Sequence, residues 1–228
     1  WGGSGADGIS FFIFDGSVTP TSPGASGGSL GYAQQTTVNG ISKGWLGIGL
    51  DEFGNFSNPT EGRDGGPGFR ADAVAIRGSG DVTTGYKYLT GTTAGLGQSP
   101  TKSIDTPNVS PRPATRKVEV TITQDQKVTV KMQLGTDPNT LTTLINSFNV
   151  AVTGQAAQPA TLKLGFAAST GGFTNNHEIR DVEIISTALS FGFTSDWASL
   201  AESIRKAVGK VASETSSLGE SIRKAVAK

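Results

Sequence analysis

The feature that most constrains the fold is a recurrence of short apolar or alternating runs, each ended by glycine, proline, asparagine or aspartate. Such runs are typical of β-strands, because helices need longer stretches with a period of about 3.6 residues. One run alternates over 118–122 and resumes over 128–132 after Asp125-Gln126, which predicts a hairpin with one solvated face. The pattern predicts an antiparallel all-β fold with strands near residues 8–14, 29–33, 45–50, 73–77, 117–124, 127–134, 141–149, 161–168 and 178–185.

Composition narrows the classes of partner. The 228 residues include 19 basic and 19 acidic side chains, so the chain has no bulk charge to attract nucleic acid or an anionic membrane. No run of about 18 apolar residues exists, which argues against a membrane span. The chain starts at Trp1 without a signal-peptide pattern, which indicates a processed or trimmed product.

One loop has the pattern of a calcium site. The Asp51 carboxylate, the Phe53 carbonyl and the Asn55 amide oxygen stand at alternate positions and can converge on one hard cation. The chain has no cysteine, and its one histidine is His177, so nitrogen and sulfur ligands for zinc or copper are scarce. The loop therefore favours Ca²⁺ over a transition metal.

The C-terminal part, residues 191–228, differs from the rest. Residues 199–210 recur as 217–228, an offset of a whole number of helical turns, and each copy opens with a Ser-x-x-Glu capping box. Apolar side chains at helical spacing predict an amphipathic helical tail, as one long helix or as a helix-turn-helix. Its apolar stripe is interpreted as a packing or assembly surface, with a membrane-surface helix as the alternative.

Four motifs occur in an order that resembles the L-type (legume-type) lectins, in their bacterial branch. They are Ala6-Asp7-Gly8 before an apolar strand, the Gly-Gly-Ser-Leu-Gly of 27–31, Asp51-x-Phe53-x-Asn55, and the Gly-Phe-Ala-Ala-Ser-Thr-Gly of 165–171. The resemblance implies a concanavalin A-like jelly-roll sandwich over residues 1–190. It also implies a shallow monosaccharide site built from loops at one end of that sandwich.

The resemblance assigns roles to individual residues. Asp7 would accept hydrogen bonds from sugar hydroxyls, a backbone N–H near Gly28 would donate one, and Asn55 would bridge metal and sugar. Gly172 and Phe173 would form the last wall, with the Phe173 ring available to stack on the sugar. The implied metal ligands are Asp51, Phe53, Asn55 and one further carboxylate, for which Asp64 is favoured over Glu61 and Asp72.

The chain departs from the family pattern in three places. Gly49 stands where the family has an acidic metal ligand, and the metal-binding histidine after the loop has no counterpart, so a second, transition-metal site is not expected. The chain also begins almost at the Ala-Asp-Gly turn, where the family has earlier strands. An exposed sheet edge or strands from another chain are the expected consequence.

The expected function is a non-enzymatic, calcium-dependent carbohydrate-binding module of a secreted or bacterial cell-surface protein. One alternative is a structural subunit that forms a homo-oligomer or filament through the tail helix or strand addition; another, less favoured, is a glycan hydrolase. The charged segment 178–183 is interpreted as the wet face of an edge strand, not as paired catalytic carboxylates. Asp7 and Asn55 as plain turn formers, and His177 as a polar strand or loop residue, are the simpler interpretations.

Overall fold

The computed structural model describes residues 5–93, 95–96, 104, 116–134, 137, 139–152 and 154–186. The chain divides into two compact units, residues 1–181 and 182–228. Every described strand belongs to the first unit. The predicted boundary between residues 190 and 191 and the predicted helical tail lie outside the described residues.

The described residues form strands and loops with one short 3-10 helix, η1 (Gly27–Ser29), which confirms the all-β prediction. None of this described structure includes a helix with the length and apolar character needed to cross a bilayer. The strands are β1 (Gly8–Asp15), β2 (Gly44–Asp51), β3 (Ala73–Arg77), β4 (Gly80–Asp81), β5 (Thr84–Gly85), β6 (Tyr88–Gly91), β7 (Val118–Ile122), β8 (Lys127–Met132), β9 (Thr142–Asn149) and β10 (Leu162–Ser169).

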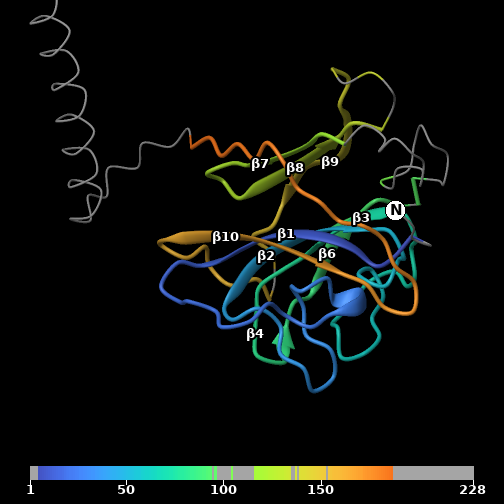
Figure 1. Cartoon of the computed structure of the whole chain (residues 1–228). Coiled ribbons are helices and arrows are strands. Elements are labelled where there is room, and N and C mark those ends of the chain that lie inside the picture. The colour runs from blue at the N-terminus through green and yellow to red at the C-terminus, as the bar shows by residue number, and fades with distance from the viewer. Residues whose placement is uncertain are drawn as a thin grey trace, which may run out of the picture. The chain divides into compact units, whose positions relative to one another are not determined.

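The strands form two antiparallel sheets (Figure 1). The larger sheet has the order β10-β1-β2-β3-β6, with β4 paired to β2 and to β5. The smaller sheet has the order β7-β8-β9. Val120 of β7 lies opposite Val130 of β8, so the predicted hairpin is confirmed.

The two sheets pack face to face through an apolar core. Alternate side chains of the larger sheet share one face, since Ile13 pairs with Leu46 and Ile48 pairs with Ile76. They join one buried cluster with side chains of the smaller sheet: Val128, Val130, Met132 and Ile145.

The opposite face of the larger sheet is covered by loops. Phe12 and Phe14 pack there with Tyr32, Phe56 and other buried side chains. Gly49 of β2 leaves room for this packing, because a Cβ atom at Gly49 would lie 2.4 Å from the Phe56 ring. Phe56 thereby anchors the Gly- and Pro-rich segment 55–70 beneath the sheet, close to the end of β2.

Two predicted strands are wrong. Residues 29–33 form a tight turn after η1, because Leu30 and Gly31 have φ values of 51° and 70°, which an extended strand does not allow. The residues next to them in the sequence are apolar because this turn is buried against the larger sheet. Residues 178–185 form no strand either, and Ile184 remains 68% exposed. The short strands β4, β5 and β6 were not predicted.

Candidate functional site

The candidate site lies where the ends of three neighbouring strands meet. In the register of the larger sheet, Gly8 at the start of β1 lies opposite Asp51 at the end of β2 and opposite Ser169 at the end of β10. The Asp7 N–H donates to the Ser169 carbonyl at 2.8 Å, and the Asp7 carbonyl accepts from the Glu52 N–H at 3.0 Å. The main chain of Asp7 therefore ties together the loops that follow β2 and β10.

The Asp7 side chain is buried, and one of its two oxygens has no hydrogen-bond donor among the described residues. It is 5% exposed, and its Oδ2 atom is buried without a hydrogen bond. Burial raises the pKa of the Asp7 carboxyl above its usual value, and the negative charge of Glu61 adds to the rise. A buried acceptor of this kind costs about 1–3 kcal/mol when no donor satisfies it. Asp7 Oδ2 is therefore a buried acceptor for which the described part of the chain supplies no donor.

The Asp51 carboxylate is engaged with its own loop. Its Oδ1 atom accepts from the Gly54 N–H and its Oδ2 atom from the Phe56 N–H, each at 2.8 Å. Burial raises the pKa of Asp51 to about 7, although N–H donors from the loop favour the ionised form. Asp51 therefore shapes the loop that carries Phe53 and Asn55.

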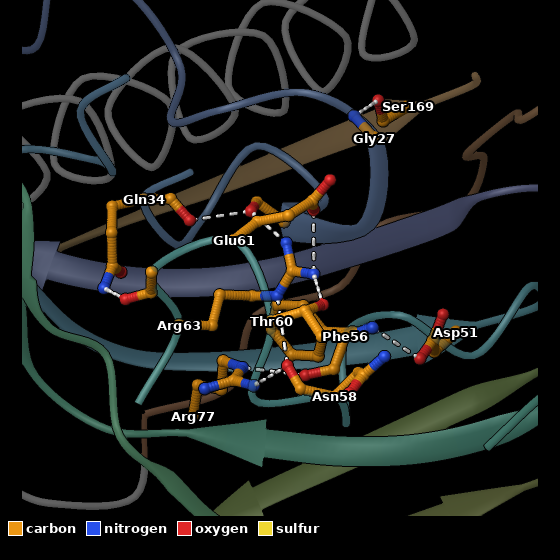
Figure 2. A network of polar contacts seen from close by, with 12 residues as sticks. Gly27, Gln34, Asp51, Phe56, Asn58, Thr60, Glu61, Arg63, Arg77 and Ser169 are labelled. Carbon is orange, nitrogen blue, oxygen red and sulfur yellow. Dashed lines mark hydrogen bonds and ion pairs between the residues drawn. The ribbon is translucent and has the colours of Figure 1, made fainter. Parts of the chain in front are cut away.

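Gly28 and Asn55 lie in direct contact across the site. A Cβ atom at Gly28 would lie 2.1 Å from the Asn55 Cβ atom, so only glycine permits this approach. The neighbouring Gly27 N–H donates to the Ser169 hydroxyl, which fixes η1 against the end of β10 (Figure 2). The predicted Gly28 loop and the predicted Asn55 loop are thus brought together.

The loop after β10 completes the site. A Cβ atom at Gly171 would lie 3.2 Å from Asp7 Oδ2, so this loop passes close to the unpartnered oxygen of Asp7. At Gly172, by contrast, no atom of the described residues lies within 4 Å of the corresponding position. The Phe173 ring stacks on the Phe53 ring with centroids 5.7 Å apart. Asp7, Gly28, Asn55 and Phe173, predicted from separate motifs, therefore belong to adjoining loops.

The predicted fourth metal ligand is less well placed. Asp64 is exposed, and its main-chain carbonyl accepts from Arg77. The alternatives are engaged elsewhere, since Glu61 forms an ion pair with Arg63 at 3.0 Å and Asp72 accepts from the Ile104 N–H. Within the described residues, no three acidic, histidine or cysteine side chains form a group that could enclose a metal ion.

Two buried arginines, which the sequence analysis did not identify, hold the loop 56–65 (Figure 2). The Arg77 guanidinium donates to five main-chain carbonyls, those of Phe56, Asn58, Asp64, Gly65 and Tyr86. Arg63 donates to the carbonyl of Asn58 and to the hydroxyls of Ser29 and Thr60. The sequence offers one signal for this role, the position of Arg77 at the end of an otherwise apolar strand.

A second missed group lies beside Asp7. Glu52 accepts from the Asn175 side-chain amide at 2.8 Å, and its other carboxylate oxygen lies 3.3 Å from His177 Nε2. The His177 side chain is 7% exposed, so it is a partly enclosed loop residue that faces Glu52. These contacts tie the loop after β10 to the loop after β2.

Comparisons with protein-family models, curated proteins and solved structures give no match for this chain.

Proposed function

We propose that this protein is a non-enzymatic carbohydrate-binding module with a jelly-roll fold. The observation that carries the proposal is the buried, unpartnered carboxylate of Asp7 at the meeting point of loops after β2 and β10. Such a carboxylate can accept hydrogen bonds from sugar hydroxyls, and a charged acceptor forms stronger hydrogen bonds than a neutral one. Secretion or display on a bacterial cell surface is the setting that suits such a module.

The surrounding groups suit a shallow sugar site. Gly28 and Asn55, which lie in contact with each other, would supply a backbone N–H and a side-chain amide. Gly172 leaves open space, and Phe173, which is 51% exposed, offers an aromatic face to the C–H groups of a sugar ring. Hydrogen-bonding groups and an exposed ring on adjoining loops are the combination that binds a polar ligand with apolar faces.

Calcium binding at the Asp51 loop is part of the proposal. Asp51, the Phe53 carbonyl and Asn55 provide hard oxygen donors, and among the described residues no lysine or arginine forms an ion pair with Asp51. Burial raises the pKa of Asp51 to about 7, and a bound cation would lower this pKa because opposite charge favours the ionised form. Asp64 remains the proposed further carboxylate because Glu61 and Asp72 are engaged with Arg63 and Ile104.

The test is a glycan array probed with the full chain, with calcium and with a chelator. We expect binding to a narrow set of glycans, loss of that binding with chelator, and no release of reducing ends from bound glycans. Release of reducing ends would favour the hydrolase instead. Retention of binding in chelator would remove calcium from the proposal and leave the sugar site standing.

A second candidate, a structural subunit, is favoured by the outer edge of the larger sheet. Among the described strands β10 pairs only with β1. Its alternate side chains Leu162, Leu164 and Phe166 are 39%, 38% and 44% exposed. An unpaired edge with an apolar stripe is suited to strand addition from another chain. This role is compatible with sugar binding at the far end of the strands.

A further inference from the structure

Three phenylalanine side chains form an aromatic platform beside Asp7, made of Phe53, Phe69 and Phe173. The Phe69 ring meets the Phe53 ring edge-on, with centroids 5.3 Å apart and an interplanar angle of 90°. The Phe173 ring stacks on the Phe53 ring with centroids 5.7 Å apart. Phe53 is therefore the ring that both of the others contact.

The outer rings of the platform are open to solvent. Phe69 is 55% exposed and Phe173 is 51% exposed. Isolated exposed apolar side chains are common on protein surfaces, but a contiguous group at a loop cluster indicates a binding surface. Offset and edge-on contacts also restrain the rings, so a ligand that covers them loses little side-chain entropy.

The platform adjoins the unpartnered carboxylate. The Phe53 N–H donates to the Asp7 carbonyl at 3.2 Å, and the Phe173 loop passes Asp7 at Gly171, where a Cβ atom would lie 3.2 Å from Asp7 Oδ2. Phe69 comes from a different segment, which is fixed to the Asp51 loop because the Arg70 N–H donates to the Gly54 carbonyl at 3.0 Å. The platform thus extends from the proposed monosaccharide site onto a further loop.

We propose that Phe69 forms a second sugar subsite, so that the ligand is a glycan of at least two units. The first unit binds Asp7 and contacts Phe173, and the second unit places its apolar C–H face on Phe69. This inference rests on the proposed carbohydrate-binding function. Its physical basis is that one sugar ring covers about one aromatic ring, which leaves Phe69 for the next unit.

The experiment compares disaccharides with their terminal monosaccharides. The full chain is first probed on an array of mannose, glucose, galactose, N-acetylglucosamine and fucose and of disaccharides that end in them. The best disaccharide and its terminal methyl monosaccharide are then titrated calorimetrically into the parent and into Phe69→Ala, Phe69→Leu and Phe69→Trp. Phe166→Ala is the matched control, since Phe166 is an exposed ring in the middle of β10 that contacts another ring, that of Phe11.

We expect Phe69→Ala and Phe69→Leu to weaken disaccharide binding about fivefold, with Phe69→Trp near the parent. Monosaccharide binding should stay unchanged in all three, and Phe166→Ala should change neither. Parent-like disaccharide binding by Phe69→Ala, or an equal loss for both sugars, would overturn the second subsite while the sugar site stands. Absence of any sugar binding by the parent would overturn the proposed function and the subsite with it.

Discussion

At the scale of single residues, Asp7 and Asp51 show how two neighbouring buried carboxylates differ in role. Asp51 gives both oxygens to N–H donors of its own loop, whereas Asp7 keeps Oδ2 without a donor. Both residues stood out in the sequence because each sits at one end of an apolar strand. This difference in hydrogen bonding follows from the local path of the backbone, which sequence patterns do not specify.

The raised pKa of Asp51 predicts a pH dependence of stability in chelator. Asp51 titrates at about 7 in the folded chain against an ordinary value of 3.8, so between these values the folded state holds a proton that the unfolded state has lost. The free energy of unfolding should therefore fall as pH rises from 4 to 7, by on the order of 4 kcal/mol at most. Urea unfolding across this range measures it.

Asp51→Asn should remove the part of this pH dependence of the free energy of unfolding that comes from Asp51. Asp125→Asn is the matched control, because Asp125 is an exposed aspartate whose pKa is lowered by hydrogen bonds with Lys127 and Thr123. If Asp51→Asn kept the slope of the parent, Asp51 would not carry the effect.

A second prediction at this scale concerns Gly28. Gly28→Ala places a methyl group 2.1 Å from the Asn55 Cβ atom, so one of the two loops must move. Glycan binding should fall at least tenfold, because polar contacts to a ligand tolerate little displacement. Gly172→Ala is the steric control for folding, since its Cβ position meets no atom within 4 Å in the described part of the chain. Calorimetric titration with an array-identified glycan measures the change, and parent-like affinity would contradict the contact.

At the scale of elements, the sequence predicts the long strands well and the short ones poorly. β1, β2 and β3 have apolar runs, and β7 and β8 alternate apolar and polar residues, so these strands are visible in the sequence. The turn at 29–33 misleads because Leu30 and Tyr32 are fully buried without being extended. β4 and β5 have two residues each, too few for any periodicity.

The loop 56–65 carries Asp64, a predicted metal ligand, but the contacts that hold this loop were not predicted. Arg77 reaches it from β3 and satisfies carbonyls of residues distant in sequence, a contact that depends on tertiary packing. Burial lowers the pKa of Arg77 to about 10, so the guanidinium stays charged at neutral pH. The conformation of the loop therefore depends on the buried, charged guanidinium of Arg77, a residue of β3.

Removal of this cation should be costly. Arg77→Met leaves several buried carbonyls without donors, and we expect a loss of about 3 kcal/mol or more in the free energy of unfolding. Arg77→Lys should restore little of it, because an ammonium lacks the planar set of five donors. Arg180→Met is the exposed control and should change stability by less than about 0.5 kcal/mol. A parent-like urea midpoint for Arg77→Met would contradict this account.

At the largest scale, two features favour assembly of several chains. One is the edge strand β10, which pairs only with β1 among the described strands, and the other is the repeated amphipathic sequence at 199–228. We predict an oligomer or filament in which the tail sequence contacts other subunits, since helices of this length gain most of their stability from a packed apolar face. Deletion of residues 199–228 should give smaller particles by light scattering with glycan binding retained. A monomeric full chain at micromolar concentration would contradict this prediction.

The central claim, that loops from three strand ends form a sugar site around Asp7, is tested most directly by calorimetric titration of Asp7→Asn. The titrant is the best glycan from the array, and Asp125→Asn serves as the control. Asp7→Asn should lose detectable binding and keep or gain free energy of unfolding, since a buried carboxylate with an unpartnered oxygen is removed. Parent-like affinity of Asp7→Asn for that glycan would contradict a sugar site around Asp7.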